Sequence, residues 1–316
     1  MSSAKQVAQY LLKNDNYHIL VHKNPDGDCL GSAGALCLAL RSLDKKAKVI
    51  LPGEVSPRLL FMWNQELEMG DFPCECVVCT DVASIGQMGQ LYEECFKDAP
   101  KSVCIDHHGT NEGYADINYI DATSAATGEM ILEIIEYMEC ELTESIARSL
   151  LVSVADDTGS FQYSNTTVRT HLTAAKLYEV IPDPEPIMRA LYGTHSFGEI
   201  TTLKALVPTM EFHLGGRVCM MFADIGEIES LGADKSNVDA WIGLPRSVEG
   251  VEVAAVFKIL SESEVKVSLR SNESVDVSLL AAKFGGGGHE RAAGVTFTEG
   301  VDTAKAKLLE ELVKLV

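Results

Sequence analysis

Asp106, His107 and His108 follow one another directly after a short apolar run, Val103–Ile105. Neighbouring histidines on a strand point to opposite faces of its sheet, so they rarely serve one site. At the end of a strand, where the chain turns, both can face the same cleft. A carboxylate beside two imidazoles suits divalent metal ions, because carboxylates bind Mn²⁺ and Mg²⁺ and imidazole favours transition metals.

Three further segments supply a carboxylate or an imidazole where a strand or helix is expected to end. They supply His22, Asp26 and Asp28, then Asp81, then the adjacent pair Asp156 and Asp157. Taken alone, each segment fits a plain structural role, as a Pro-Gly turn, a helix N-cap or a second turn. Four such segments at element ends fit one shared site better than four unrelated turns.

The chemistry that these residues favour is that of two neighbouring divalent cations. Two metal ions about 3.5–4 Å apart can activate water and hold a phosphoryl group in line for displacement. Such close cations need a carboxylate that bridges them, and further carboxylates offset their charge. The pattern therefore predicts a two-metal centre that acts on phosphate esters.

The first half of the chain alternates between elements that would position this centre. Strands are predicted at residues 17–23, 47–52, 76–81 and 102–106. A helix is predicted at 31–43, and helices dominate from Thr127 to about Val180. The strands are almost continuously apolar, as in parallel sheets covered on both faces, which predicts a doubly wound α/β domain. Ligands bind outside the carboxyl ends of such strands, where the four segments fall.

A proline-rich stretch divides the chain. Three of the ten prolines lie in Ile181–Pro186, the best candidate for a linker. Strands are predicted after it at 217–224, 251–260 and 265–270, then a glycine run and a charged helix at 302–315. We expect a catalytic metal-binding domain at 1–182, linker helices at 183–210 and a smaller α/β substrate-binding domain at 211–316. The active site is expected in the cleft between the two domains.

Composition limits the partners of the chain. Lys and Arg total 26 against 46 Asp and Glu, a formal charge of −20, so a basic groove for long nucleic acid is not expected. The N-terminal residues lack the apolar core of a signal peptide, and no apolar run has the length of a membrane helix. Nine cysteines without a secretory signal favour reduced thiols in the cytoplasm.

The ordered motifs resemble those of the DHH phosphoesterases, a family named for the run seen here as Asp106-His107-His108. Their first motif, H-x-x-x-D-x-D, corresponds to His22, Asp26 and Asp28, and their second to Asp81. Their fourth is similar to Asp157-Thr158-Gly159, which favours Asp157 over Asp156. The glycine-rich C-terminal run of the NrnA-like branch matches Gly286–Gly294.

The resemblance implies a role for each matching position. His22 and Asp26 correspond to ligands of a first Mn²⁺, and Asp28, His107 and Asp157 to ligands of a second, with Mg²⁺ or Co²⁺ as alternatives. Asp81 corresponds to the bridging ligand, His108 to a catalytic histidine that faces the substrate, and Asp106 to the residue that orients a histidine. The predicted substrate-binding residues are Arg270, Gly286, Gly287, Gly288, His289 and Arg291.

The resemblance also implies the reaction. It is hydrolysis of very short oligoribonucleotides and of 3′-phosphoadenosine 5′-phosphate (pAp). A phosphodiesterase for cyclic or linear dinucleotides is the main alternative, and a homodimer is left open. A RecJ-like exonuclease fits less well, because the chain is short and acidic. The glycine-rich run disfavours an inorganic pyrophosphatase, and a non-catalytic nucleotide sensor is disfavoured because every ligand position is present.

Overall fold

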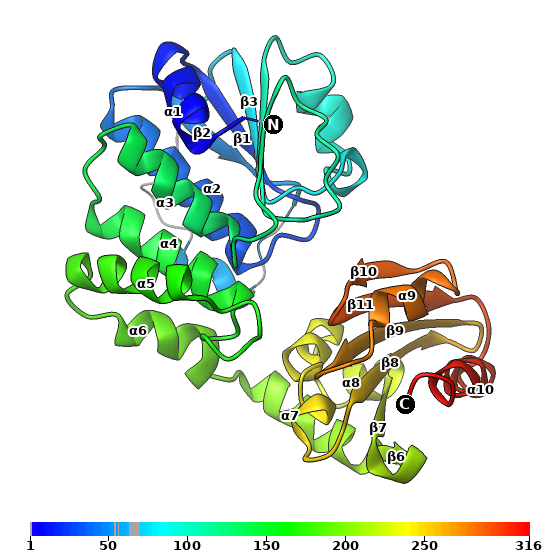
Figure 1. The fold of residues 1–316 in the computed structure, drawn as a ribbon. Coiled ribbons are helices and arrows are strands. Elements are labelled where there is room, and N and C mark those ends of the chain that lie inside the picture. The colour runs from blue at the N-terminus through cyan, green and yellow to red at the C-terminus, as the bar shows by residue number, and fades with distance from the viewer. Residues whose placement is uncertain (1, 54, 56, 63–69) are drawn as a thin grey trace. The chain divides into compact units, whose positions relative to one another are not determined.

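The computed structural model describes residues 2–53, 55, 57–62 and 70–316. The chain forms two compact units, Met1–Thr194 and His195–Val316, each with its own sheet (Figure 1). Both units combine helices with a sheet, so the predicted α/β class is confirmed. Within the described ranges, no helix has the length and apolar character needed to cross a membrane.

The sheet of the first unit is fully parallel and has the strand order β2-β1-β3-β4-β5. Its strands are β1 Tyr17–Leu20, β2 Ala47–Ile50, β3 Cys76–Thr80, β4 Ser102–Asp106 and β5 Ile117–Ile120. Every residue of the inner strands β3 and β4 is buried, which explains their continuous apolar runs. The four predicted strands are confirmed. The edge strand β5 was not predicted, because its four residues include a polar asparagine and give too short a pattern.

Helices pack on this sheet, and the ends of several of them lie at the site. They are α1 Ala4–Lys13, α2 Gly27–Ser42, α3 Thr127–Tyr137, α4 Glu144–Asp157, α5 Val168–Val180 and α6 Glu185–Met188. Helix α2 packs closely against α4. A Cβ atom on Gly31 would lie only 2.5 Å from the Ser149 carbonyl oxygen, so this approach requires glycine. This close approach fixes the N-terminal end of α2 beside the C-terminal end of α4.

The second unit has a six-stranded sheet with the order β10-β11-β9-β8-β7-β6, in which only the β7–β8 pair is parallel. The strands are β6 Glu211–His213, β7 Val218–Asp224, β8 Val253–Ser261, β9 Glu264–Ser271, β10 Gly287–His289 and β11 Ala292–Phe297. Helices α9 Val277–Ala282 and α10 Val301–Leu312 cover one face, and α7 Phe197–Leu206 and α8 Ile225–Ser230 pack on the other. The three predicted strands and the terminal helix are confirmed.

Candidate metal centre

The first segment of the centre turns from the end of β1 into α2. Asp26 is the N-cap of α2, and its Oδ1 accepts a hydrogen bond from the Cys29 amide at 3.0 Å. His22 Nε2 lies 3.6 Å from Asp26 Oδ1, so both side chains reach the same place. The Cys29 thiol lies beside them, but burial and the nearby Asp81 charge hold its pKa well above the usual value, which keeps it protonated.

Asp28 is the second residue of α2 and is fully buried at the N-terminus of α3. Its carboxylate accepts the amide protons of Thr127 at 2.8 Å and Gly128 at 3.2 Å, and Ser153 Oγ donates to it as well. A Cβ atom on Gly128 would lie 2.0 Å from Ser153 Oγ, so this arrangement needs glycine. Burial raises the pKa of Asp28 well above its usual range, and the Asp157 charge raises it further.

Asp81 follows β3 with a left-handed backbone (φ 59°), and its two oxygens face different neighbours. Oδ2 lies 3.8 Å from His22 Nε2, whereas Oδ1 lies 3.6 Å from His107 Nε2 and 3.5 Å from His108 Nδ1. Thr127 Oγ1 donates to Oδ1 at 3.1 Å. Burial raises the pKa of Asp81 well above its usual range, and the neighbouring carboxylates Asp28, Asp26 and Asp157 add to the rise.

His107, just after β4, lies among the carboxylates. Its Nε2 is 3.1 Å from Asp157 Oδ2 and 3.7 Å from Asp28 Oδ2, while its Nδ1 is 3.2 Å from the Ser124 carbonyl oxygen. The carbonyl can only accept, so this contact places a proton on Nδ1 and directs Nε2 toward the carboxylates.

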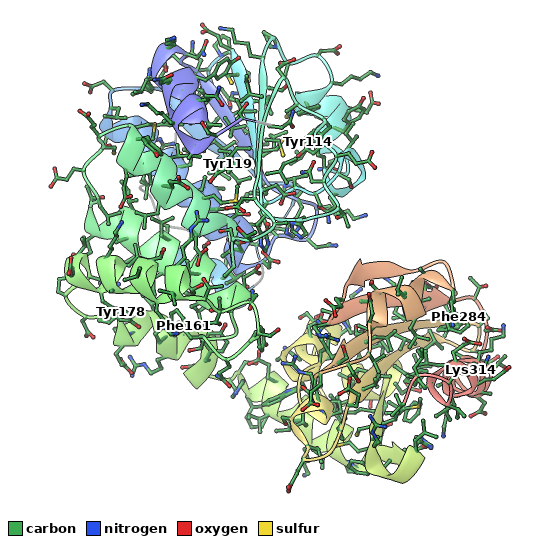
Figure 2. All side chains as sticks on the ribbon, in the orientation of Figure 1. Tyr114, Tyr119, Phe161, Tyr178, Phe284 and Lys314 are labelled. Carbon is green, nitrogen blue, oxygen red and sulfur yellow. The ribbon has the colours of Figure 1, made fainter. Side chains whose placement is uncertain are left out.

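His108 and Asp106 form a separate pair. Asp106 Oδ1 lies 2.7 Å from His108 Nδ1, and Asn111 Nδ2 donates to Asp106 Oδ2 at 2.7 Å. Burial favours the neutral acid, but the hydrogen bonds and charge of His108 and the hydrogen bond from Asn111 outweigh it, so the pKa of Asp106 is lowered. Tyr114, labelled in Figure 2, donates to the Val82 carbonyl oxygen at 2.8 Å and so braces the segment that follows Asp81.

The structure separates the two adjacent acids at the end of α4. Asp157 faces His107, whereas Asp156 Oδ2 accepts the Gly27 amide proton at 2.8 Å and so anchors the start of α2. A Cβ atom on Gly27 would lie 2.6 Å from Asp156 Cβ. The centre therefore joins all six predicted ligand positions, and Asp156 holds two of its elements together.

Two comparisons decide the family. A model of the DHH family, N-terminal domain, matches residues 16–155, and a model of the DHHA1 domain matches residues 216–316. The bifunctional oligoribonuclease and PAP phosphatase NrnA of Thermus thermophilus is 33% identical over 295 residues, which cover 92% of this chain and 86% of the relative. The chain belongs to the DHH family. It is an NrnA-like phosphoesterase, a hydrolase of phosphoester bonds, as its ordered motifs indicated.

Two further similarities extend the comparison. The cyclic-di-AMP phosphodiesterase PdeA of Listeria monocytogenes is 26% identical over 308 residues, which cover 90% of this chain and 45% of that protein. The crystal structure of an exopolyphosphatase-related protein from Bacteroides fragilis superimposes with a TM-score of 0.90 at 22% identity, covering 98% of this chain and 96% of that one. This structural likeness supports the DHH fold.

The predicted substrate-binding residues lie around the β10–β11 hairpin of the DHHA1 domain. Arg270 lies in β9, where its backbone pairs with Ala292, and the Ser271 amide donates to the Arg291 carbonyl at 3.2 Å, so the two arginines come from adjacent segments. Arg291 Nη1 donates to the Val275 carbonyl at 2.9 Å. His289 ends β10, and its side chain lies outside what the structure describes.

The glycine run of the DHHA1 domain has a packing role of its own. A Cβ atom on Gly286 would lie 2.2 Å from the Gly294 carbonyl oxygen, and one on Gly288 (φ 146°) would lie 2.5 Å from that of Ala292. Both glycines therefore allow β10 to lie close against β11. Gly287 differs, because a Cβ atom there would meet nothing within 4 Å.

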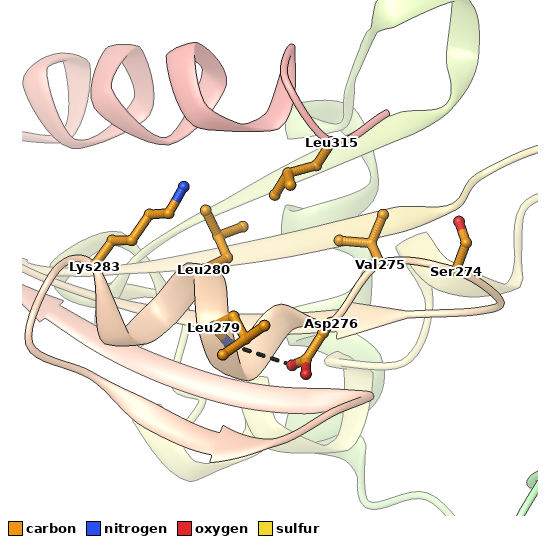
Figure 3. A pocket seen from close by; sticks show the side chains of 7 residues that line it. All are labelled: Ser274, Val275, Asp276, Leu279, Leu280, Lys283 and Leu315. Carbon is orange, nitrogen blue, oxygen red and sulfur yellow. Dashed lines mark hydrogen bonds between the residues drawn. The ribbon is translucent and has the colours of Figure 1, made fainter.

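A cavity of about 330 Å³ lies between α9 and the C-terminal end of the chain (Figure 3). It is lined by Ser274, Val275, Asp276, Leu279, Leu280, Lys283 and Leu315. Asp276 caps α9 by accepting the Leu279 amide proton at 3.2 Å, so the acidic residue of the wall is already engaged. None of the predicted substrate-binding residues lines this cavity.

The residues that hydrogen-bond to the proposed ligands were not predicted from the sequence. Thr127, Ser153 and Ser124 hold Asp81, Asp28 and His107, but each is an ordinary residue of a helix or loop in the sequence. The one available signal was the segment Ser124-Ala125-Ala126-Thr127-Gly128, whose small residues precede a long apolar helix without a proline or charge to explain them.

Proposed function

We propose that the chain is a Mn²⁺-dependent phosphoesterase that hydrolyses short oligoribonucleotides and pAp to mononucleotides. The observation that carries this proposal is the position of Asp81, whose two carboxylate oxygens face His22 on one side and His107 on the other. A carboxylate shared in this way suits a bridge between two cations.

The donor set fits divalent cations. Four carboxylates crowd against two imidazoles, in the set His22, Asp26, Asp28, Asp81, His107 and Asp157. Burial and the neighbouring carboxylates raise the pKa values of Asp28 and Asp81, and bound divalent cations would offset this concentration of negative charge. Oxygen and imidazole donors in this proportion suit Mn²⁺, with Mg²⁺ or Co²⁺ as alternatives.

The donors fall into two groups that share Asp81. His22 and Asp26 would hold one cation, and Asp28, His107 and Asp157 would hold the other. When bound, the cations would polarise the phosphoryl group of the substrate and make a water molecule more acidic.

The chain's own residues would then orient the substrate. His108 is assigned to the scissile phosphate, as a hydrogen-bond donor and a source or acceptor of a proton. Asp106 Oδ1 lies 2.7 Å from His108 Nδ1, which fixes the plane of the ring. Arg270 and Arg291, with the glycines of β10, are assigned to the remaining phosphate and base, because arginine matches phosphate with two parallel donors.

The substrate class follows from the relatives. The Thermus thermophilus relative is named for oligoribonuclease and PAP phosphatase activities, and alignment over 92% of this chain supports the same pair here. The similarity to PdeA favours a second candidate, a phosphodiesterase for cyclic dinucleotides.

A turnover panel tests the proposal. Metal-depleted protein is reloaded with Mn²⁺, Mg²⁺ or Co²⁺ and assayed on pAp, on ribonucleotides of two to five residues, on cyclic di-AMP and on pyrophosphate. We expect Mn²⁺-dependent release of mononucleotides from pAp and the short RNAs. Exclusive turnover of cyclic di-AMP would establish the second candidate. Full activity in chelator, with metal content checked, would refute the metal-dependent reaction.

A further inference from the structure

Arg169, one residue into α5, holds a three-way ion cluster at the edge of the DHH domain. Its Nη1 lies 2.8 Å from Asp121 Oδ2, its Nη2 lies 3.2 Å from Glu133 Oε2, and its Nε lies 3.7 Å from Glu129 Oε2. Tyr119, labelled in Figure 2, donates to Glu133 Oε2 at 2.9 Å. One guanidinium thus contacts three carboxylates from two parts of the chain, and no residue of the centre itself takes part.

The Glu129 carboxylate links Arg169 to the loop beside the centre. Its side chain is fully buried in α3, yet Arg169 is the one cation within salt-bridge range of it among the described residues. Glu129 Oε2 accepts hydrogen bonds from Ser124 Oγ at 2.9 Å and from the Ala125 amide at 3.1 Å. A buried carboxylate with these partners fixes the end of the loop at residues 121–126, while Asp121 fixes its start.

That loop supplies the hydrogen-bond acceptor of His107. The Ser124 carbonyl oxygen lies 3.2 Å from His107 Nδ1. The Asp121 amide donates to the Asp106 carbonyl at 3.1 Å, so the loop is also tied to the end of β4. A shift of the loop would therefore turn the imidazole that faces Asp157 and Asp28.

Asn165 joins the same loop to the other side of the centre. Its Nδ2 donates to the Ala125 carbonyl at 3.0 Å and to the Asp157 carbonyl at 3.1 Å. Its Oδ1 has no hydrogen-bond partner among the described residues, so this side chain holds the loop through its amide nitrogen. Asn165 precedes α5 and Arg169 is the second residue of that helix, and the two hold the loop from two directions.

We infer that Arg169 and Asn165 are positioning residues, which act through the loop at 121–126 to hold His107 and Asp157 in the geometry that binds a divalent cation. The inference rests on the proposed function for the ligand roles of His107 and Asp157. Neither residue belongs to the proposed ligand set or to the proposed substrate-binding residues. Outer partners of metal-binding side chains typically change metal affinity about 10- to 100-fold when they are removed.

Arg169→Met tests the inference, with Arg148→Met as its matched control. Arg148 lies on α4 of the same domain, has a similar exposure (39% against 35%) and pairs with Glu144 of its own helix at 2.7 Å. Three quantities are measured: Mn²⁺ affinity by calorimetry, hydrogen exchange of residues 121–126 in chelator, and kcat and KM for a ribodinucleotide. Arg169→Met should weaken Mn²⁺ binding about 10- to 100-fold, speed loop exchange and lower kcat with little change in KM. Arg148→Met should change none of these quantities. Arg169→Lys should restore only part of the loss, because lysine keeps the positive charge but lacks the planar fork of donors.

The outcomes separate the possibilities. Wild-type Mn²⁺ affinity and wild-type loop exchange in Arg169→Met would overturn the inference. If that variant does not fold, Asn165→Leu is measured in the same way, and unchanged values there overturn it equally. If the wild-type protein binds no Mn²⁺, the proposed function fails, and loop exchange in chelator alone decides whether Arg169 positions the loop.

Discussion

His107 Nε2 lies 3.1 Å from Asp157 Oδ2, where the residue after β4 meets the last residue of α4. Burial alone would lower the pKa of His107, but the hydrogen bond to Asp157 and the charges of Asp28, Asp157 and Asp81 outweigh it and raise the pKa to about 11. A protonated imidazole therefore supplies, in the metal-free chain, part of the positive charge that the proposed cations would bring.

Asp81→Asn should abolish turnover while it stabilises the metal-free protein. Asparagine keeps an oxygen for the Thr127 hydroxyl but cannot bridge two cations, so kcat/KM should fall at least about 100-fold, the upper range for loss of a metal's outer partner. The buried negative charge is also removed, so the melting temperature in chelator should rise. Asp116→Asn is the control, because Asp116 accepts from Ser102 outside the centre. A stable variant with wild-type kinetics would contradict the assignment of Asp81.

Mn²⁺ should stabilise the wild-type protein against unfolding, because it binds a site that exists only in the folded chain. At a free concentration of 100 times Kd the gain is about 2.7 kcal/mol. Denaturant titrations with and without Mn²⁺ measure it, and Asp81→Asn should lose most of the gain. An equal gain in both proteins would show that the cation binds elsewhere.

Arg291→Ala should raise KM strongly and leave Mn²⁺ binding unchanged. Loss of a charged hydrogen bond to phosphate costs about 1.5–3 kcal/mol, roughly a 10- to 150-fold change. Arg217→Ala is a control in the same domain, since Arg217 Nη1 donates to the Val316 carbonyl. Steady-state kinetics on pAp and on a dinucleotide provide the comparison, and unchanged KM on both would mean that the substrate does not reach Arg291.

Glu252 should make the DHHA1 domain sensitive to acid. Its carboxylate is buried and accepts the amide protons of Ser274 at 2.7 Å and Val275 at 2.8 Å. Burial favours the neutral acid, but these hydrogen bonds outweigh it, so the folded-state pKa is lowered. The stabilisation is therefore complete above the unfolded-state pKa of about 4.3 and is lost as the pH falls through the folded-state pKa.

Glu252→Gln isolates this contribution. The variant should be less stable than wild type by about 1.5–3 kcal/mol at pH 7, and the difference should shrink as the pH falls below about 4. Urea unfolding at several pH values measures it, with Glu262→Gln, at an exposed position, as the control. A difference that stays constant down to pH 3 would assign the effect to packing.

The sequence was sufficient to predict the parallel sheet and to predict that the proposed ligand side chains lie close together, for different physical reasons. Buried strands such as β3 and β4 show continuous apolar runs, and the ends of parallel strands meet at one edge, so Asp81 and His107 could be placed together. The choice of Asp157 over Asp156 came from the motif alone, because two adjacent acids at a helix end look alike until the last turn is oriented.

The supporting residues could not be predicted in the same way. Ser153 and Arg169 act through contacts with Asp28 and Glu129 that depend on how α4 and α5 pack, and neither contact has a sequence pattern. β10 was missed because three residues with two glycines have no strand propensity, and its pairing with β11 decides their conformation.

Efficiency should fall as the RNA lengthens. The formal charge of −20 repels a long polyanion, and each bound phosphate needs a cation or a set of amide donors. The proposed metal centre and the proposed contacts of Arg270 and Arg291 would suffice for the scissile phosphate and one or two neighbours.

Comparing kcat/KM for RNAs of about two and about twenty nucleotides at two salt concentrations measures this preference. We expect the shorter RNA to be the better substrate, with a shallow dependence on salt because few counterions are released. Equal or better efficiency on the longer RNA, with a steep salt slope, would instead require a basic surface assembled from separate lysines or from two copies of the chain. That result would favour a RecJ-like exonuclease, because a processive enzyme must hold the strand well beyond the scissile bond.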